Sequence, residues 1–120
     1  LRPISHNGHF LGQGAPVWEI RQIVGEQNNM LVLTKELGKS LAEALGKGSV
    51  VLMRGHGNAV AGPDLKTAVF RAIYTDVNAK LQMQAVMLGG PINLLTESQQ
   101  LKAHKADRPW ATWKKQVGAP

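Results

Sequence analysis

The stretch GSVVLMRGHGNAVAGPD, residues 48–64, decides the fold of this 120-residue chain. Residues 49–54 form an apolar run of strand length, which is typical of a strand that is buried on both faces. Residues 58–62 predict a second strand, and Asp64 is a candidate N-cap for a following helix. His56 stands between the two strands and is flanked by glycines. A histidine at this place is either a polar turn residue or a ligand held at the end of a rigid strand.

The segments on either side of this stretch predict helices. Thr34 is a candidate N-cap for a helix whose apolar residues recur at helical spacing and which ends at Gly46 or Gly48. A long helix over residues 65–88 follows the two strands. It is apolar around so much of its circumference that we expect it to be packed on more than one side.

The C-terminal part predicts a further helix. Thr96 and Gln99 fit a capping box for a helix near 97–106, and Pro109 is expected to interrupt it. The remaining segments are a short strand at 17–20 and loops at 1–16 and 21–29.

Composition and charge narrow the class of protein. The hydrophobic fraction of 43% and the charged fraction of 18% are typical of a globular domain, and the lack of cysteine excludes disulfides and thiolate metal sites. No apolar run approaches the ~20 residues that span a bilayer, and no signal peptide is recognised, so we expect a cytoplasmic protein without a membrane partner. Residues 101–120 carry +4 of the net charge of +6. This basic tail could bind nucleic acid through Trp110 and Trp113, but no nucleic-acid motif accompanies it. The favoured interpretation is a solvated helix face whose tryptophans pack on the domain or on a neighbouring subunit.

The order of these elements resembles the class II aldolase/adducin family. Residues 48–85 are similar to its C-terminal signature of an apolar strand, an HG turn, a short strand that ends in Gly, and a long helix. LRPISHNGHFLGQGAPV, residues 1–17, resembles the family loop that follows its first metal motif. The resemblance covers residues 1–95 and implies an α/β, three-layer αβα fold, to which this chain contributes part of the central sheet and the C-terminal helices. We therefore expect residues 1–120 to be the C-terminal part of a single class II aldolase-like domain whose N-terminal half is absent, and 96–120 to be a basic helical tail.

The resemblance also implies a function. Family members include lyases that cleave C–C bonds, of the aldolase or the decarboxylase type, and the RPISHNGHFLG loop favours the decarboxylase type. They bind a divalent metal, usually zinc, through three histidines, two from an HxH motif and one from the HG turn, and the metal stabilises an enediolate. By this pattern His56 is the third metal ligand. The substrate would be a small hydroxy-carbonyl compound or a carboxylate. The family forms homo-oligomers, namely tetramers with active sites at subunit interfaces.

The sequence departs from the family pattern because it contains no HxH motif. His6 and His9, spaced HxxH, could complete a three-histidine site with His56. The favoured interpretation is instead that His6 borders the active site, where it shapes the pocket or donates a proton, and the alternative is an ordinary loop histidine. Arg54 is a candidate for binding an acidic substrate group, unless the strand turns it away. Tyr74 is a candidate catalytic hydroxyl, unless it packs in the core.

Two other functions remain open at this stage. A non-catalytic, adducin-like interaction module would keep the fold and lack a complete metal site. A basic nucleic-acid-binding domain is the third candidate. An HxH motif upstream in the parent gene would favour the enzyme over the interaction module.

Overall fold

The computed structural model describes residues 1–101 and 106–118, which form a mixed α/β structure around a small sheet. The strands are β1 (Val17–Trp18), β2 (Val50–Met53) and β3 (Gly57–Val60). Their order in the sheet is β1-β2-β3; β1 is parallel to β2, and β2 is antiparallel to β3. The apolar run at 49–54 therefore supplies the central strand, as predicted.

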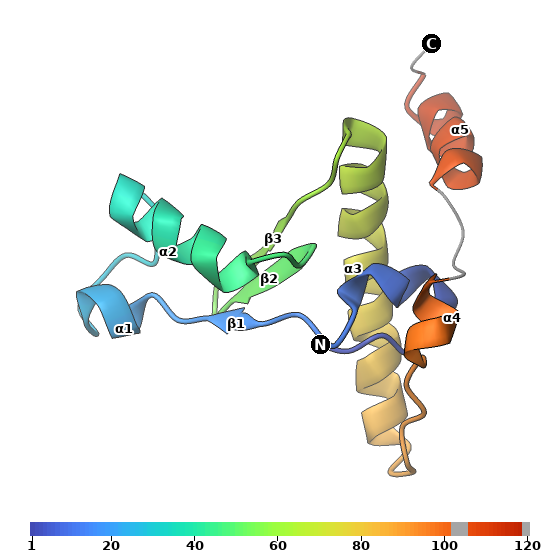
Figure 1. Cartoon of the computed structure of the whole chain (residues 1–120), viewed down its shortest axis with the longest axis horizontal. Coiled ribbons are helices and arrows are strands. Elements are labelled where there is room, and N and C mark those ends of the chain that lie inside the picture. Colours follow the sequence, from blue (N-terminus) through green and yellow to red (C-terminus); the bar gives the residue numbers. More distant parts are fainter. Residues whose placement is uncertain (102–105, 119–120) are drawn as a thin grey trace.

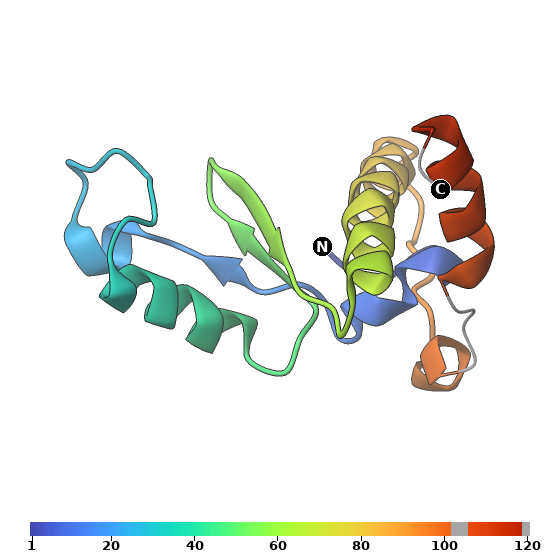
Figure 2. The same ribbon diagram turned by 90° about the horizontal axis from the view of Figure 1, so that it is seen from above.

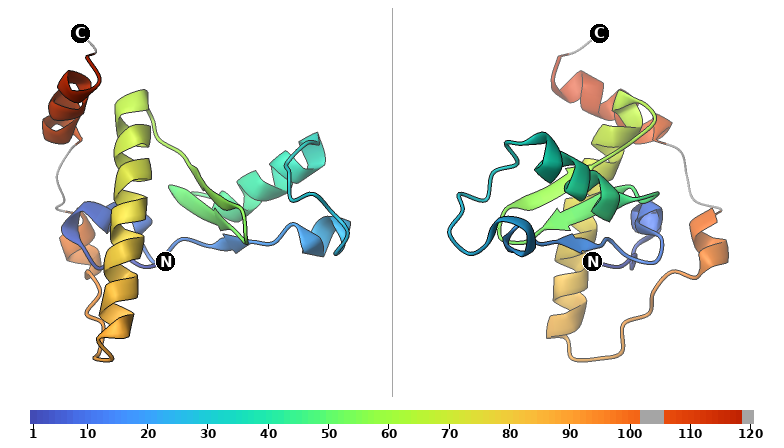
Figure 3. Two further views of the ribbon diagram at one scale, coloured as in Figure 1. Left: turned by 180° about the vertical axis from the view of Figure 1, so that it is seen from behind. Right: turned by 60° about the vertical axis from the view of Figure 1, so that its left-hand side comes forward.

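Both faces of β2 are covered at its start. Val50 and Val51 are 2% and 0% exposed, and successive side chains of a strand point to opposite faces. The face of Val51 packs against Trp18 and Leu37, and Leu37 belongs to helix α2 (Lys35–Leu45). Figure 3 (right) shows α2 in front of the sheet and helix α3 (Leu65–Met87) behind it. The central strand is thus held in place by a helix on one face and by its two neighbours in the sheet.

The predicted N-caps of the two main helices are confirmed. The Thr34 hydroxyl accepts a hydrogen bond from Leu37 N at 3.3 Å at the start of α2. Gly46 ends α2 as predicted, but with φ 54° and ψ −127° rather than the expected left-handed helical cap; glycine adopts this positive φ without a steric cost. Asp64 accepts a hydrogen bond from Thr67 N at 2.7 Å at the start of α3 (Leu65–Met87).

Helix α3 is packed on more than one side, as expected, because it contacts η1 (His6–Leu11), α5 (Asp107–Gln116) and β3, but much of its C-terminal half is exposed. Its buried residues are Phe70, Thr75 and Asn78, whereas Val86 and Met87 are 59% and 78% exposed. Two of the buried positions are polar, and both have hydrogen-bond partners: Thr75 Oγ1 donates to Arg71 O in the same helix, and Asn78 bonds the backbone of the N-terminal segment. The apolar residues Met83, Val86 and Met87 of its C-terminal half border a hollow together with Leu1 and Leu52 and stay largely exposed.

Asn78 joins the N-terminal segment to α3. It is 0% exposed; its Oδ1 accepts from Ile4 N and Ser5 N, both at 3.2 Å, and its Nδ2 donates to Arg2 O at 2.8 Å. A Cβ on Gly8 would lie 2.4 Å from Asn78 Oδ1, so only glycine fits this contact. Figure 1 shows the resulting arrangement, with the N-terminal segment beside α3.

Two segments that were expected to be loops contain short helices. Residues 1–16 include a 3-10 helix, η1 (His6–Leu11), and residues 21–29 include α1 (Arg21–Val24). Neither segment has the long apolar period that marks a helix in a sequence. The 3-10 helix η1 packs on α3 and on helix α4 (Glu97–Leu101), and these tertiary contacts rather than the local sequence pattern account for it.

The C-terminal segments form two helices, α4 (Glu97–Leu101) and α5 (Asp107–Gln116). The capping box of α4 is confirmed, because Thr96 N donates to Gln99 Oε1 at 2.9 Å and Gln99 N donates to Thr96 Oγ1 at 3.4 Å. The predicted continuation of this helix over 102–105 lies outside the described residues. Pro109 does not interrupt α5; it occupies the first turn, where the missing N–H would have no intrahelical acceptor. Across the described ranges, no helix is long and apolar enough to cross a membrane.

Candidate functional site

The hairpin between β2 and β3 presents His56 at its tip. Met53 pairs with Gly57 across the hairpin, and His56 N donates to Met53 O at 3.0 Å. Gly55 has φ 69°, and a Cβ there would lie 2.9 Å from Cε of Met30, so the turn requires glycine for two reasons. The His56 imidazole is exposed on a short turn that continues the buried central strand.

Arg54 lies beside Glu19 at the same end of the sheet. Arg54 Nε is 2.8 Å from Glu19 Oε2, and Arg21 Nη2 is 2.7 Å from the same oxygen. The hydrogen bond from Arg21, aided by the charges of both guanidinium groups, lowers the pKa of Glu19 to about 2. Arg54 is therefore paired with a carboxylate of its own chain, and a substrate anion would have to compete with Glu19 for it.

The low pKa of Glu19 predicts an acid-dependent loss of stability. The folded-state pKa of about 2 lies below the ordinary value of 4.5. The two ion pairs of this carboxylate therefore stabilise the folded state fully when the pH is above the ordinary pKa. This stabilisation is lost as the pH falls through about 2. Glu19→Gln, which cannot ionise, is expected to make the thermal midpoint less dependent on pH in this window. Melting curves from about pH 2 to about pH 6 measure the difference.

Glu26→Gln is the matched control for this experiment. The Glu26 carboxylate is 81% exposed and lies 3.4 Å from Nη1 of Arg21, so its replacement is expected to leave the pH dependence of the wild type in place. Identical pH dependence of Glu19→Gln and the wild type would contradict the assignment of the acid transition to Glu19.

His6 and Tyr74 lie where η1 packs on α3. His9 Nδ1 is 3.1 Å from His6 O, and the ring of His9 is 6.3 Å from that of Phe70, between centroids. The ring of Tyr74 follows at 4.7 Å from Phe70. Burial lowers the pKa of His9 below its ordinary value, which favours the neutral imidazole. His6 is exposed, and Tyr74 is half-buried in an aromatic cluster that borders a cavity.

The direction of the strands separates these residues from His56. β1 follows η1 in the chain and runs parallel to β2, so the start of β2 faces η1 and the hairpin tip lies at the opposite end. Figure 2 shows this tip pointing away from α3 and η1. The alternative of a site formed by His6, His9 and His56 is therefore wrong. In the ranges 1–101 and 106–118, no group of three or more His, Cys, Asp or Glu side chains could hold a metal ion.

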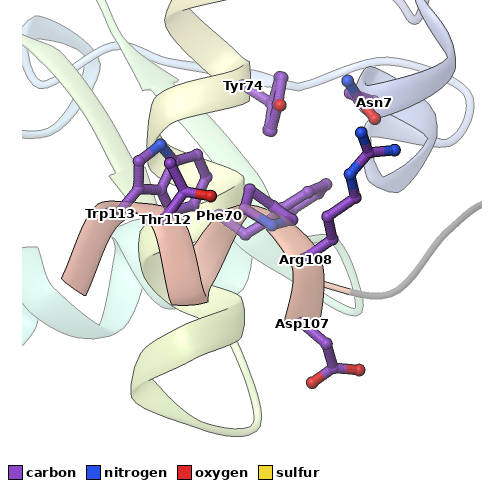
Figure 4. Close-up of a pocket in the computed structure, with 8 residues that line it drawn as sticks. Asn7, Phe70, Tyr74, Asp107, Arg108, Thr112 and Trp113 are labelled. Atoms are coloured by element: carbon purple, nitrogen blue, oxygen red, sulfur yellow. The ribbon is translucent and has the colours of Figure 1, made fainter. Parts of the chain in front are cut away.

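A cavity of about 700 Å³ lies between η1, α3 and α5. Figure 4 shows Trp113, Phe70 and Tyr74 on one side of it and Arg108 and Asn7 on the other. The packing of Trp113 against Phe70 and Tyr74 confirms that this tryptophan of the basic tail packs on the domain. The sequence did not predict the cavity, because its walls come from three segments that only the tertiary structure brings together.

Known proteins resemble this chain in sequence. The family model described as "Class II Aldolase and Adducin N-terminal domain" matches residues 8–83. The decarboxylase tropJ of Talaromyces stipitatus is 33% identical over 142 aligned residues, which cover 98% of this chain and 53% of that protein. A 3,4-dihydroxyphthalate decarboxylase from a Terrabacter species is 39% identical, over 51% of this chain and 26% of that protein. The enzyme of the same name from Arthrobacter keyseri is 36% identical, over 58% of this chain and 28% of that protein.

These alignments also define how much of a relative the chain represents. It spans about half the length of tropJ and smaller parts of the two other relatives. The matched family region, residues 8–83, includes η1 from Gly8 onward, the three strands, α2 and most of α3. It therefore contains the hairpin with His56 and the segment with Tyr74, but not the cavity wall from α5.

Proposed function

Because this chain belongs to the class II aldolase and adducin family, we propose that it is part of a lyase that breaks a C–C bond in a small organic acid, most simply by decarboxylation. The curated relatives above are decarboxylases. The single observation that carries the proposal is the exposed His56 imidazole, held on a glycine-flanked turn at the end of a buried strand. Short, anchored turns of this kind hold an imidazole in the fixed position that a metal ligand needs.

His56 is suited to be one ligand of a metal site, but the described residues do not supply a complete set of ligands. Zinc in a catalytic site takes three protein ligands, and the described part of the chain holds no group of three or more His, Cys, Asp or Glu side chains that could bind a metal ion with His56. We therefore propose that His56 is one ligand of a divalent metal ion, and zinc is the ion that we expect. The remaining ligands would come from outside this chain. A divalent cation bound there would supply Lewis-acid stabilisation of negative charge on a substrate oxygen, which in an aldolase-type reaction is an enediolate oxygen.

The other predicted site residues receive proposed roles in handling the substrate and its protons. Loss of CO2 leaves the electron pair of the broken bond on the substrate, and a proton has to reach that carbon. His6 and the Tyr74 hydroxyl are our candidates for proton donors. Arg54 is a candidate for binding an acidic group of the substrate in exchange with Glu19. The basis for these proposed roles is the chemical character of each side chain.

The separation of His6 and Tyr74 from His56 supports an oligomer. One chain cannot bring both ends of its sheet to the same substrate, whereas two copies in a symmetric assembly can. We therefore place the active site at an interface between copies, in a homo-oligomer that is a tetramer by family resemblance. Within each copy, residues 1–120 would form the C-terminal part of one three-layer domain, with 96–120 as its basic helical tail.

Metal removal tests this function in the full protein that contains the chain. Release of CO2 from a panel of aromatic and hydroxy carboxylic acids is expected for at least one acid. Treatment with a chelator should abolish the activity, and added Zn²⁺ should restore it, because the metal supplies the charge stabilisation. Activity that is unchanged after verified metal removal would contradict the proposal.

A non-catalytic interaction module is the second candidate, favoured by the incomplete donor set around His56. It predicts that the full protein binds no stoichiometric divalent metal. Elemental analysis of the purified protein therefore separates the two candidates without a known substrate.

A further inference from the structure

The cavity between η1, α3 and α5 has one aromatic side. The rings of Phe70, Tyr74 and Trp113 lie at centroid distances of 4.7, 6.1 and 6.5 Å from one another and are inclined by 47–48°. At about 700 Å³, the cavity falls within the range of small-molecule sites, roughly 300–1,000 Å³. Flat apolar groups gain both burial and ring–ring contact against such a wall.

The opposite side of the cavity is polar and carries one available cation. The Arg108 side chain reaches from the start of α5 toward Asn7 (Figure 4). The neighbouring Asp107 carboxylate is already paired with Lys66, a residue of α3. Within 1–101 and 106–118, no carboxylate lies within ion-pair distance of Arg108. Its guanidinium group therefore keeps its planar set of N–H donors for an external anion.

We propose that this cavity binds an aromatic carboxylate, with the ring against Phe70, Tyr74 and Trp113 and the carboxylate on Arg108. The two sides of the cavity match the two ends of such a molecule. A guanidinium group pairs with a planar carboxylate through two parallel hydrogen bonds, and the Asn7 amide, beside Arg108, can donate a further one. A single guanidinium group balances one negative charge, so the fitting ligand is a monoanion.

This inference goes beyond the proposed function, because binding in the cavity requires no chemistry at His56. The cavity lies at the η1 end of the sheet, away from the hairpin tip. It assigns a binding role to four residues that the function above does not use: Asn7, Phe70, Arg108 and Trp113. Tyr74 would contact the ligand as part of the wall, whatever its role in proton transfer.

Titration with benzoate tests the proposal in the full protein. Binding is followed by the NMR signal of the Trp113 indole N–H, which is assigned with the variant Trp113→Phe. We expect saturable binding with a dissociation constant of roughly 1 mM or below. Cyclohexanecarboxylate, which has the charge but lacks the aromatic ring, should bind about two- to tenfold more weakly. Benzamide, which lacks the charge, should bind at least about tenfold more weakly than benzoate.

Variants of α5 locate the binding. Arg108→Leu is expected to weaken benzoate binding about tenfold or more, and Arg108→Lys should weaken it less, because it keeps the charge but not the paired geometry. Lys115→Leu is the matched control, since Lys115 is an exposed cation of the same helix that does not line the cavity; it should bind benzoate like the wild type. No saturable binding, or equal binding by the wild type and Arg108→Leu, would overturn the proposal.

His56→Ala separates this inference from the proposed function. The variant should retain benzoate binding, because the cavity is remote from the hairpin tip. Benzoate binding in a protein that decarboxylates no acid would support the cavity and count against the lyase. Decarboxylation without benzoate binding would support the lyase and overturn the cavity assignment.

Discussion

If the proposed function is right, replacing His56 by alanine is expected to abolish stoichiometric metal binding by the full protein and to lower the proposed lyase activity by at least about a hundredfold. Removal of a group that only supports a metal ligand already costs roughly 10- to 100-fold in activity or metal affinity, and removal of a ligand should cost more. Stability should change little, because the imidazole is exposed and lies on a turn. Elemental analysis, activity and the thermal midpoint are measured on the same sample.

Asn58→Ala provides the matched control for this substitution. Asn58 is exposed and lies on β3, two residues beyond His56. Its replacement is expected to leave metal content and activity near those of the wild type. Full metal occupancy in His56→Ala would exclude His56 as a ligand, and loss of metal in both variants would point to damage of the hairpin rather than to a lost ligand.

Replacing Asn78 by leucine is expected to lower the free energy of unfolding by about 3 kcal/mol or more. The side chain keeps a similar volume, but the backbone N–H groups of Ile4 and Ser5 and the carbonyl of Arg2 lose their partner. Each buried polar group without a partner costs about 1–3 kcal/mol. The N-terminal segment should then detach from α3. Denaturant unfolding measures the loss, and faster amide exchange at Ile4 and Ser5 identifies its source.

Gln82→Ala is the control for the N-terminal segment. Gln82 Oε1 also accepts a hydrogen bond from this segment, from Arg2 N at 2.9 Å, but at an exposed position. Water replaces such a partner, so the loss should stay below about 1 kcal/mol. An unfolding midpoint of Asn78→Leu equal to that of Gln82→Ala would show that the buried contacts do not hold the segment.

The parts of the fold that the sequence predicted depend on contacts between near neighbours in the chain. The caps by Thr34 and Asp64 and the capping box of Thr96 with Gln99 link residues three positions apart. The central strand follows from its apolar run, and the position of His56 follows from the glycine-flanked turn after it. Local spacing and conformational preference are sufficient for each of these features.

The features that the sequence did not predict depend on contacts between distant segments. Asn78 in an apolar helix has no local signature, since its partners lie more than 70 positions earlier in the chain. The 3-10 helix η1 packs on α3 and α4, which come from distant parts of the chain. Arg108 was part of a basic tail in the sequence, and it borders a cavity only because α5 packs on α3.

The sequence by itself determined the central strand, the two main capped helices and a histidine at the end of a rigid hairpin. These follow from apolar periodicity, caps and glycine turns, which act within a few residues. Only the tertiary structure decided which predicted site residues lie together. The parallel pairing of β1 with β2 sets His6 and Tyr74 at one end of the sheet and His56 at the other. Strand direction and helix packing depend on contacts between distant segments. They reduce the number of unpaired backbone groups and the exposed apolar surface of the whole chain, so no single segment determines them.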